Sequence, residues 1–303
     1  MAERVRVPEG ARRAWCRREL VDSVQLDGLR TTVGAVLDLA HRAGEPADEG
    51  HPAWEHAPRA SRRVILGESA LSRALPRVAL APIRSAMLRE LHARAMAGSG
   101  GEAPGRWREV EVWIGPPGST IRTARFVPPP PALVPELVAR LDAFLAVDGP
   151  GPGLVRAALA YHQLETIQPF AEGSGLANRM LVTLLLTETA GEVGGRAGLS
   201  RSFLDRPAEY LRCLQAVRER GDWETWVEYF LRGVAEAAHR AAAYLEGLED
   251  MRREHVHMVD RDLGASAASA AVLLESLLCR PVVQVADVAR LAGRTFANAN
   301  QLV

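Results

Sequence analysis

A glycine-bearing turn between two apolar helical patterns is the feature that most constrains this chain. A helical pattern at residues 155–167 is stopped by Pro169. The next turn carries Gly173 and Gly175, and a second apolar helical pattern covers residues 178–186. The turn therefore lies at a helix N-terminus, where backbone N–H groups and the helix dipole favour a negatively charged group. Taken alone, it is as consistent with a simple helix cap as with an anion site.

Hydrophobic periodicity elsewhere predicts a mainly α protein. A helical period covers residues 20–43, 71–97, 134–147, 155–167, 178–189, 207–220 and 223–248. Residues 110–127 are the exception, because β-branched and aromatic residues there flank the turn Gly115-Pro116-Pro117-Gly118. That composition predicts a β-hairpin. The stretches 44–56 and 98–105 are rich in Gly, Pro and small residues and are predicted to be linkers.

We predict three regions along the chain. Residues 1–97 form an N-terminal helical region, and residues 98–250 form the core with the hairpin and the loop at 168–179. Residues 251–303 form a C-terminal set of helices.

The C-terminal pattern is similar to part of a DNA-binding module. Helical stretches at 271–278 and 285–291 and the final residues resemble the helix-turn-helix start of a winged helix, without its wing strands. DNA contacts would be limited to Arg280, Arg290 and Arg294, which is few for phosphate anchoring. We therefore expect a structural or dimerising role and no nucleic-acid partner.

Composition excludes several classes of protein. The 303 residues are 48% hydrophobic, so the chain can bury a full core. Its formal net charge is zero, so no overall electrostatic field attracts it to nucleic acid or anionic lipid. It contains no lysine, which excludes a lysine base and favours a GC-rich bacterial genome. Cys16, Cys213 and Cys279 have no CxxC spacing. With no signal-like or membrane-spanning apolar run, we expect a cytoplasmic protein without a membrane partner.

The loop and its neighbours together resemble the Fic (Fic/DOC) family. The family's loop has the pattern His-Pro-Phe, any residue, Asp or Glu, Gly-Asn-Gly-Arg, two residues, Arg. The matching positions are Pro169, Phe170, Glu172, Gly173, Gly175 and Arg179. The departures are Gln168 in place of His, Ser174 in place of Asn and Leu176 in place of the first Arg.

Stretches outside the loop extend the resemblance. Ser23 and Asp27, followed by a glycine, resemble the Ser/Thr-x-x-x-Glu-Gly pattern of the family's inhibitory helix, with Asp in place of Glu. Residues 110–127 correspond to the family's flap hairpin, and residues 203–230 resemble its later helices. The resemblance implies a Fic-fold helical bundle in which Asp27 pairs with Arg179. A purely structural salt bridge between two helices is an equal alternative.

The exchanged residues change what the loop can do. In Fic enzymes the His is the base that activates a target hydroxyl for attack on the α-phosphate of ATP, and the amide of Gln168 does not titrate near neutrality. Leu176 offers no charge-assisted bond to phosphate, and Ser174 keeps only a hydroxyl donor. We therefore expect standard AMP transfer to be lost. Glu172 keeps the position that holds Mg²⁺ in the family, so Mg²⁺ with nucleotide is the implied cofactor if the ancestral site survives.

Candidate site residues are assigned from the same resemblance. Contacts to a substrate or anion are expected from Gln168, Phe170, Gly173, Ser174, Gly175, Leu176 and Arg179. Candidate acids or bases are Glu172, Asp27 and Tyr161. Tyr161 lies seven residues before Gln168, near the same helix face, although a core tyrosine is the plainer interpretation. Glu165 is expected to brace the loop.

Three functions stay open. The first is an enzyme whose altered pocket binds and transforms a non-nucleotide small molecule, as in bacterial small-molecule biosynthesis, since polar groups are exchanged while the framework stays intact. The second is a non-catalytic or weakly active relative that binds ATP or ADP, or a protein or peptide at the flap. The third is a helix-turn-helix regulator. A homodimer is compatible with each of them.

Overall fold

The computed structural model describes residues 9–44, 52–98, 104–146, 152–195, 198–279, 281–293 and 295–300. The α-helices are α1 Glu9–Leu26, α2 Val33–Ala43, α3 Pro52–Glu55, α4 Arg59–Ala74, α5 Ser85–Ala95, α6 Val134–Ala146, α7 Gly153–Ile167, α8 Ser174–Gly195, α9 Leu199–Asp205, α10 Pro207–Arg220, α11 Trp223–Asp262, α12 Ala267–Cys279, α13 Val285–Leu291 and α14 Phe296–Ala299. Short 3₁₀ helices lie at Leu75–Arg77, Pro131–Leu133 and Gly264–Ser266. The prediction of a mainly α protein is confirmed.

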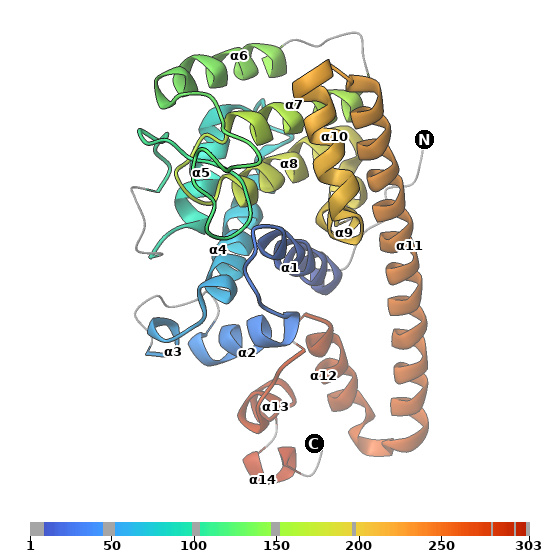
Figure 1. Ribbon diagram of the computed structural model, residues 1–303. Helices are drawn as coiled ribbons and strands as arrows, with labels where there is room; N and C mark the ends of the chain where they lie inside the picture. Colours follow the sequence, from blue (N-terminus) through green and yellow to red (C-terminus); the bar gives the residue numbers. More distant parts are fainter. Residues whose placement is uncertain are drawn as a thin grey trace.

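Helices α7 and α8 pack against each other at the centre of the fold (Figure 1). Trp226 of α11 is fully buried beside them, and its indole N–H donates to Ala158 O of α7 at 2.8 Å. The ring of Tyr161 lies 6.0 Å from that indole, between centroids. Burying such large aromatic side chains contributes strongly to stability. The loop that joins α7 to α8 is thus anchored at both ends in the core.

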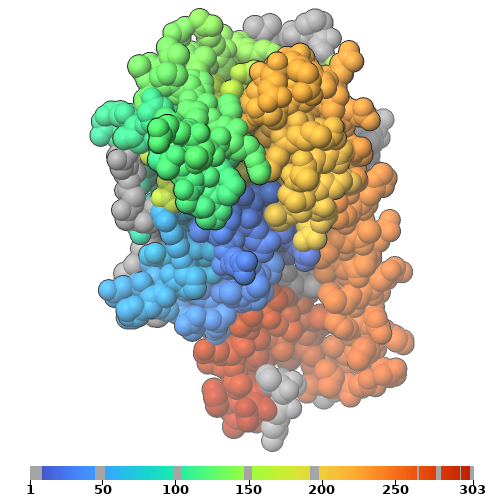
Figure 2. Space-filling view, viewed as in Figure 1, coloured from blue at the N-terminus to red at the C-terminus, as the bar shows by residue number. Residues whose placement is uncertain are grey.

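The other helices enclose this central pair. Helices α1 and α5 pack on α8, helices α6 and α11 pack on α7, and α4 packs on both α1 and α5. Figure 2 shows the segment around 104–146, in teal to green, beside α10, in yellow to orange, and above α1 and α2, in blue. Helix α1 therefore reaches the loop from one side, and the segment after residue 104 reaches it from another.

Two predicted helices are interrupted. The pattern at 20–43 forms two helices, because Gly28 takes a φ of 80° and the Thr32 hydroxyl caps α2 by accepting from Ala35 N at 3.1 Å. The pattern at 71–97 is divided between α4, a 3₁₀ turn and α5, since prolines in it cannot continue an α-helix. The first break places the end of α1 beside the loop.

The predicted β-hairpin at 110–127 is wrong. Within residues 104–146 the structure has an isolated antiparallel bridge between Ile114 and Phe126 and no strand. Ile114 N donates to Phe126 O at 2.8 Å, but the prolines next in the chain carry no N–H to extend the ladder. The guanidinium carbon of Arg218 in α10 lies 3.6 Å from the Phe126 ring centroid. This segment is therefore held by side-chain contacts more than by strand pairing.

The C-terminal helices form the lower end of the molecule (Figure 1). Helix α11 crosses residue 250 without a break and runs beyond its predicted end, and α12 packs against α1 and α11. Helices α12, α13 and α14 lie at the positions of the predicted helix-turn-helix pattern. Arg290 is paired with Asp287 at 2.5 Å, while Arg280 and Arg294 lie outside the described residues. The division into three regions stays a prediction.

The predicted linkers are only partly described. Within 44–56, helix α3 occupies Pro52–Glu55, and most of 98–105 lies outside the described residues. Across the described ranges, no helix combines the length and the apolar content that crossing a bilayer requires.

Candidate functional site

The loop leaves α7 through a residue in the left-handed region. Gln168 has a φ of 44° and a ψ of 70°, and it is the one non-glycine with positive φ in the described chain. Its N–H donates to Leu164 O at 2.9 Å, and Pro169 prevents a further helical turn. Such a backbone conformation costs about 1–3 kcal/mol and persists only where surrounding contacts impose it.

Arg108 supplies those contacts. This arginine is buried, and its Nε donates to Gln168 O at 2.8 Å while its backbone N–H donates to Pro169 O at 2.9 Å. Its Nη2 donates to Pro129 O at 2.5 Å. One guanidinium thus ties the loop to the segment that precedes α6. Arg108 was not predicted to be a site residue, because nothing in its local pattern distinguishes it from the neighbouring arginines.

Several residues predicted to contact a ligand are used inside the protein. The Ser174 hydroxyl accepts from Phe170 N at 2.8 Å and donates to Phe170 O at 3.0 Å. Leu176 is 1% exposed in the hydrophobic core. Gly173 has a φ of 74°, and a Cβ there would lie 2.7 Å from Met96 Sδ, so glycine is required. These residues shape the loop and leave few groups for a ligand.

Arg179 is the charged group that the loop retains. It is buried, and its Nη2 donates to Asp27 Oδ1 at 2.6 Å and to Ser23 O at 2.9 Å, while its Nε donates to Ser23 Oγ at 2.6 Å. Burial alone would lower the pKa of Arg179, but the adjacent Asp27 carboxylate raises it. The guanidinium therefore stays charged, and the resemblance-based expectation of an Asp27–Arg179 pair agrees with the geometry.

Gly175 lies where the Asp27 carboxylate meets the first turn of α8. A Cβ added to Gly175 would be 2.4 Å from Asp27 Oδ1 and 2.9 Å from Arg179 Nη1. The carboxylate thus sits against the helix N-terminus as well as against the guanidinium, a position that favours a negative charge. The Asp27 carboxylate therefore occupies this site in the way that a small bound anion would.

Glu172 is held by two arginines of α4. Arg59 Nη2 donates to one carboxylate oxygen and Arg63 Nη2 donates to the other, at 2.5 Å for Arg63. The Glu172 carbonyl oxygen lies 2.8 Å from His92 Nε2, and the His92 ring stacks on Phe170 at 3.7 Å between centroids. Partial burial would raise the pKa of Glu172, but the bonds from Arg63 and Arg59 lower it. Glu172 is therefore a paired carboxylate. Neither arginine was predicted from the sequence.

Tyr161 has the surroundings of a core tyrosine. Its hydroxyl lies 2.8 Å from the Tyr210 hydroxyl, and it is fully buried. Burial raises the pKa of Tyr161 far above its ordinary value. Such a phenol does not ionise near neutrality, so we assign Tyr161 no acid–base role.

Glu165 is the carboxylate nearest to the side chain of Gln168. Its Oε2 accepts from Gln168 Nε2 at 3.3 Å, and its Oε1 accepts from Asn178 Nδ2 at 3.0 Å. Burial raises the pKa of Glu165, although Arg179 and Asn178 oppose that shift. Glu165 does brace the loop as expected, and its environment also suits proton transfer. Asn178, which orients it, was not identified from the sequence; its spacing from Glu165 carries no recognisable signal.

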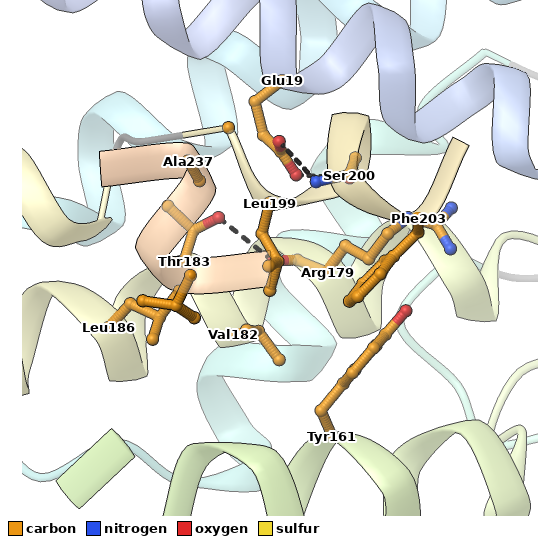
Figure 3. Close-up of a pocket in the computed structure, with 12 residues that line it drawn as sticks. Glu19, Tyr161, Arg179, Val182, Thr183, Leu186, Leu199, Ser200, Phe203 and Ala237 are labelled. Atoms are coloured by element: carbon orange, nitrogen blue, oxygen red, sulfur yellow. Dashed lines mark hydrogen bonds between the residues drawn. The ribbon is translucent and has the colours of Figure 1, made fainter. Parts of the chain in front are cut away.

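A small cavity lies beside Arg179 (Figure 3). It has a volume of about 10 Å³ and is lined by residues of α1, α7, α8, α9 and α11, including Glu19, Tyr161, Phe203 and Val234. That volume suits about one water molecule. Glu19 Oε2 accepts from Ser200 N at 3.0 Å across this space. The cavity is too small to hold a metabolite.

The chain is similar to proteins of one known family. Residues 82–186 match the model of the Fic/DOC family. A Fic family protein from Desulfovibrio desulfuricans G20 superposes with a TM-score of 0.63 at 20% identity, covering 96% of this chain and 78% of that chain. A Fic domain containing signaling protein from Bacteroides thetaiotaomicron VPI-5482 gives 0.52 at 17% identity, covering 75% of this chain and 87% of that one. A variant of Fic-1 from C. elegans gives 0.52 at 19% identity, with 78% and 64% covered. At these identities the solved structures show a common fold.

Proposed function

Because this chain belongs to the Fic/DOC family, we propose that it uses the family's loop to bind and transform a small anionic molecule other than a nucleotide. The observation that carries this proposal is the Asp27 carboxylate against Arg179 and Gly175. A single compact anion, such as a carboxylate or one phosphoryl group, fits that place once Asp27 withdraws. A triphosphate chain lacks its second anchor, because Leu176 is buried and uncharged.

Glu165 is the group we assign to proton transfer in such a reaction. Glu172 and Asp27 are both engaged with guanidiniums, whereas Glu165 contacts only amides with its carboxylate oxygens among the bonds described. A carboxylate whose pKa is raised by burial and which is oriented by Asn178 suits general acid–base work. The Gln168 amide covers one of its oxygens, so a ligand that displaces this amide would meet the carboxylate.

The second candidate is a non-catalytic or weakly active relative that binds ATP or ADP. The Asp27–Arg179 pair favours it, because this pair resembles the contact by which the family's inhibitory helix excludes the outer phosphate of ATP. Under this alternative the loop would still accept a nucleotide when Asp27 is absent. The two candidates therefore differ in what binds to a protein that lacks the Asp27 charge.

The test is ligand binding to Asp27→Asn. Inorganic phosphate at about ten times its Kd should stabilise this variant by about 1.4 kcal/mol, measured as a rise in Tm, and wild type should respond less because Asp27 occupies the site. ATP should bind no more tightly than phosphate. Adding Gly175→Ala to Asp27→Asn should abolish the response, because the new methyl occupies the place of the anion. Asp38→Asn, an exposed aspartate of α2 paired with Arg42, is the matched control.

Two results would contradict the proposal. If ATP binds Asp27→Asn a hundred-fold more tightly than phosphate, or if wild type transfers labelled AMP to protein, the nucleotide-binding candidate is correct. Restoration of the family's pattern by Gln168→His, Ser174→Asn and Leu176→Arg separates these cases further, since only a surviving nucleotide site should regain transfer. A screen of phosphorylated and carboxylated metabolites, comparing wild type with Glu165→Gln, would then identify the reaction.

A further inference from the structure

The carboxylate of Glu172, which stands where the family holds a metal ion, is already neutralised. One oxygen accepts from Arg59 and the other from Arg63. The Arg63 side chain is 5% exposed and that of Arg59 is 40% exposed, so one guanidinium is a fixed part of the interior and the other reaches solvent. Both arginines come from α4, four residues apart and therefore on one face of that helix.

A divalent cation does not fit these residues. Mg²⁺ is held by one or two free carboxylates together with substrate oxygens, and here the carboxylate oxygens face guanidiniums. A divalent ion bound to Glu172 would lie beside two positive charges, which repel it. Across the described ranges, no cluster of three or more His, Cys, Asp or Glu is arranged to hold a metal. Both ring nitrogens of the nearby His92 are already hydrogen-bonded: Nε2 lies 2.8 Å from the Glu172 carbonyl oxygen, and Nδ1 accepts from Gly105 N at 2.8 Å. His92 therefore offers no substitute metal ligand.

The two arginines have unused donors. The Nε atoms of Arg59 and Arg63 are buried without a hydrogen-bond partner in the described structure. Two guanidiniums against one carboxylate also leave one positive charge in excess beside the turn that begins α8. Unsatisfied guanidinium donors and surplus positive charge both favour an incoming anion.

We propose that this loop is a metal-free anion site, in which Arg59 and Arg63 supply the positive charge that Mg²⁺ supplies in the family. This inference rests on the proposed function for the identity of its ligand, an anionic small molecule. It goes beyond that function because it replaces the implied cofactor with two residues of α4. Glu172 then serves to position the two guanidiniums and is not a metal ligand.

The first arm of the test uses Mn²⁺ alone, measured by calorimetry or by the loss of its free-ion electron paramagnetic resonance signal. Wild type should show no Mn²⁺ binding that depends on Glu172. The variant Arg59→Gln/Arg63→Gln should bind Mn²⁺ at least about ten-fold more tightly, because the repelling charges are gone. Removing Glu172 as well, by Glu172→Gln, should abolish the gain. Arg73→Gln, an exposed arginine of the same helix, should behave as wild type.

Tight Mn²⁺ binding by wild type that is lost in Glu172→Gln would overturn the inference. Because Arg63 is buried, the double variant could fail to fold. The single variant Arg59→Gln, whose arginine is half-exposed, gives the same comparison with less risk, and it should show a smaller gain in Mn²⁺ affinity. An unchanged Mn²⁺ affinity in folded Arg59→Gln and in the folded double variant would also count against the inference.

The second arm uses inorganic phosphate with Asp27→Asn in the presence of a chelator. Phosphate binding should survive the chelator, and addition of Arg59→Gln should weaken it at least about three-fold, while Arg73→Gln should not. A phosphate response that requires added Mg²⁺ would overturn the inference. If no phosphate binds but the Mn²⁺ measurements give the expected result, the proposed function is wrong. The conclusion that Glu172 does not hold a metal ion is then still supported.

Discussion

Replacing Arg179 by methionine should lower the free energy of unfolding by about 3 kcal/mol and abolish phosphate binding in the Asp27→Asn background. Removing one partner of a buried ion pair is strongly destabilising, because the other partner is left uncompensated. Arg179 donates to Asp27 and to Ser23, and these acceptors would lose their donors. The Asp27 side chain is 25% exposed, so water can recover part of the loss, which is why we expect the lower end of the usual range.

A double-mutant cycle measures the pair directly. Asp27→Asn in wild type leaves the Arg179 charge buried without its carboxylate, whereas Asp27→Asn in Arg179→Met removes a charge that no longer has a partner. The second change should therefore cost much less than the first, with a coupling energy of about 1–3 kcal/mol by urea denaturation. Arg140→Met is the control, because Arg140 is 74% exposed in its pair with Glu136 and should change stability by less than about 0.5 kcal/mol. Equal costs in both backgrounds would show that the pair contributes little.

The resemblance-based part of the site was predictable because its signals are local. The proline, glycines and apolar period around residues 155–186 indicated a helix, a turn and a second helix, and α7 and α8 occur in that order. The Asp27–Arg179 contact could be expected only through the family pattern, since 152 residues separate the partners. Periodicity also placed α10 and α13 at their observed bounds. Hydrophobic periodicity predicts a helix correctly where the residues that contact the rest of the protein recur with the helical period.

The residues that change the chemistry of the loop could not be predicted in this way. Arg59 is 113 residues from Glu172, and the sequence offers many arginines of equal local character. The hairpin failed for a related reason: β-branched composition indicates a strand, but prolines and the contact of Phe126 with Arg218 decide how the segment is held. In each case a long-range side-chain contact outweighs local propensity.

Glu19→Gln should remove a pH dependence of stability worth about 3 kcal/mol. Glu19 is buried at the small cavity beside Arg179 (Figure 3), and burial raises its pKa from 4.5 to about 7, although its bonds from Ser200 oppose the shift. The folded protein therefore holds a proton on Glu19 between pH 4.5 and about 7, where the unfolded chain has released it. Stability from this group is full below pH 4.5 and falls as the pH rises to about 7.

The pKa shift of His162 changes stability with pH in the opposite direction. The effect of Glu19 must therefore be measured as a difference between wild type and Glu19→Gln. Burial lowers the pKa of His162 from 6.5 to about 4, and the unfolded chain binds the extra proton between these values. Stability from His162 therefore rises with pH over that window, which partly masks Glu19 in wild type. Subtracting the wild-type from the Glu19→Gln free energies of unfolding cancels His162, because that residue is present in both.

The difference between the two proteins should change by about 3 kcal/mol between pH 4.5 and pH 8, in favour of the glutamine at high pH. Glutamine keeps the shape of the side chain and can still accept from Ser200 N, so the change reports ionisation more than packing. Urea denaturation at four pH values across this range measures it. A difference that stays constant with pH would mean that Glu19 is ionised throughout. In that case a buried charge on α1, one turn before Ser23, would have to be balanced by Arg179, and the Asp27–Arg179 pair would share its guanidinium charge with a second carboxylate.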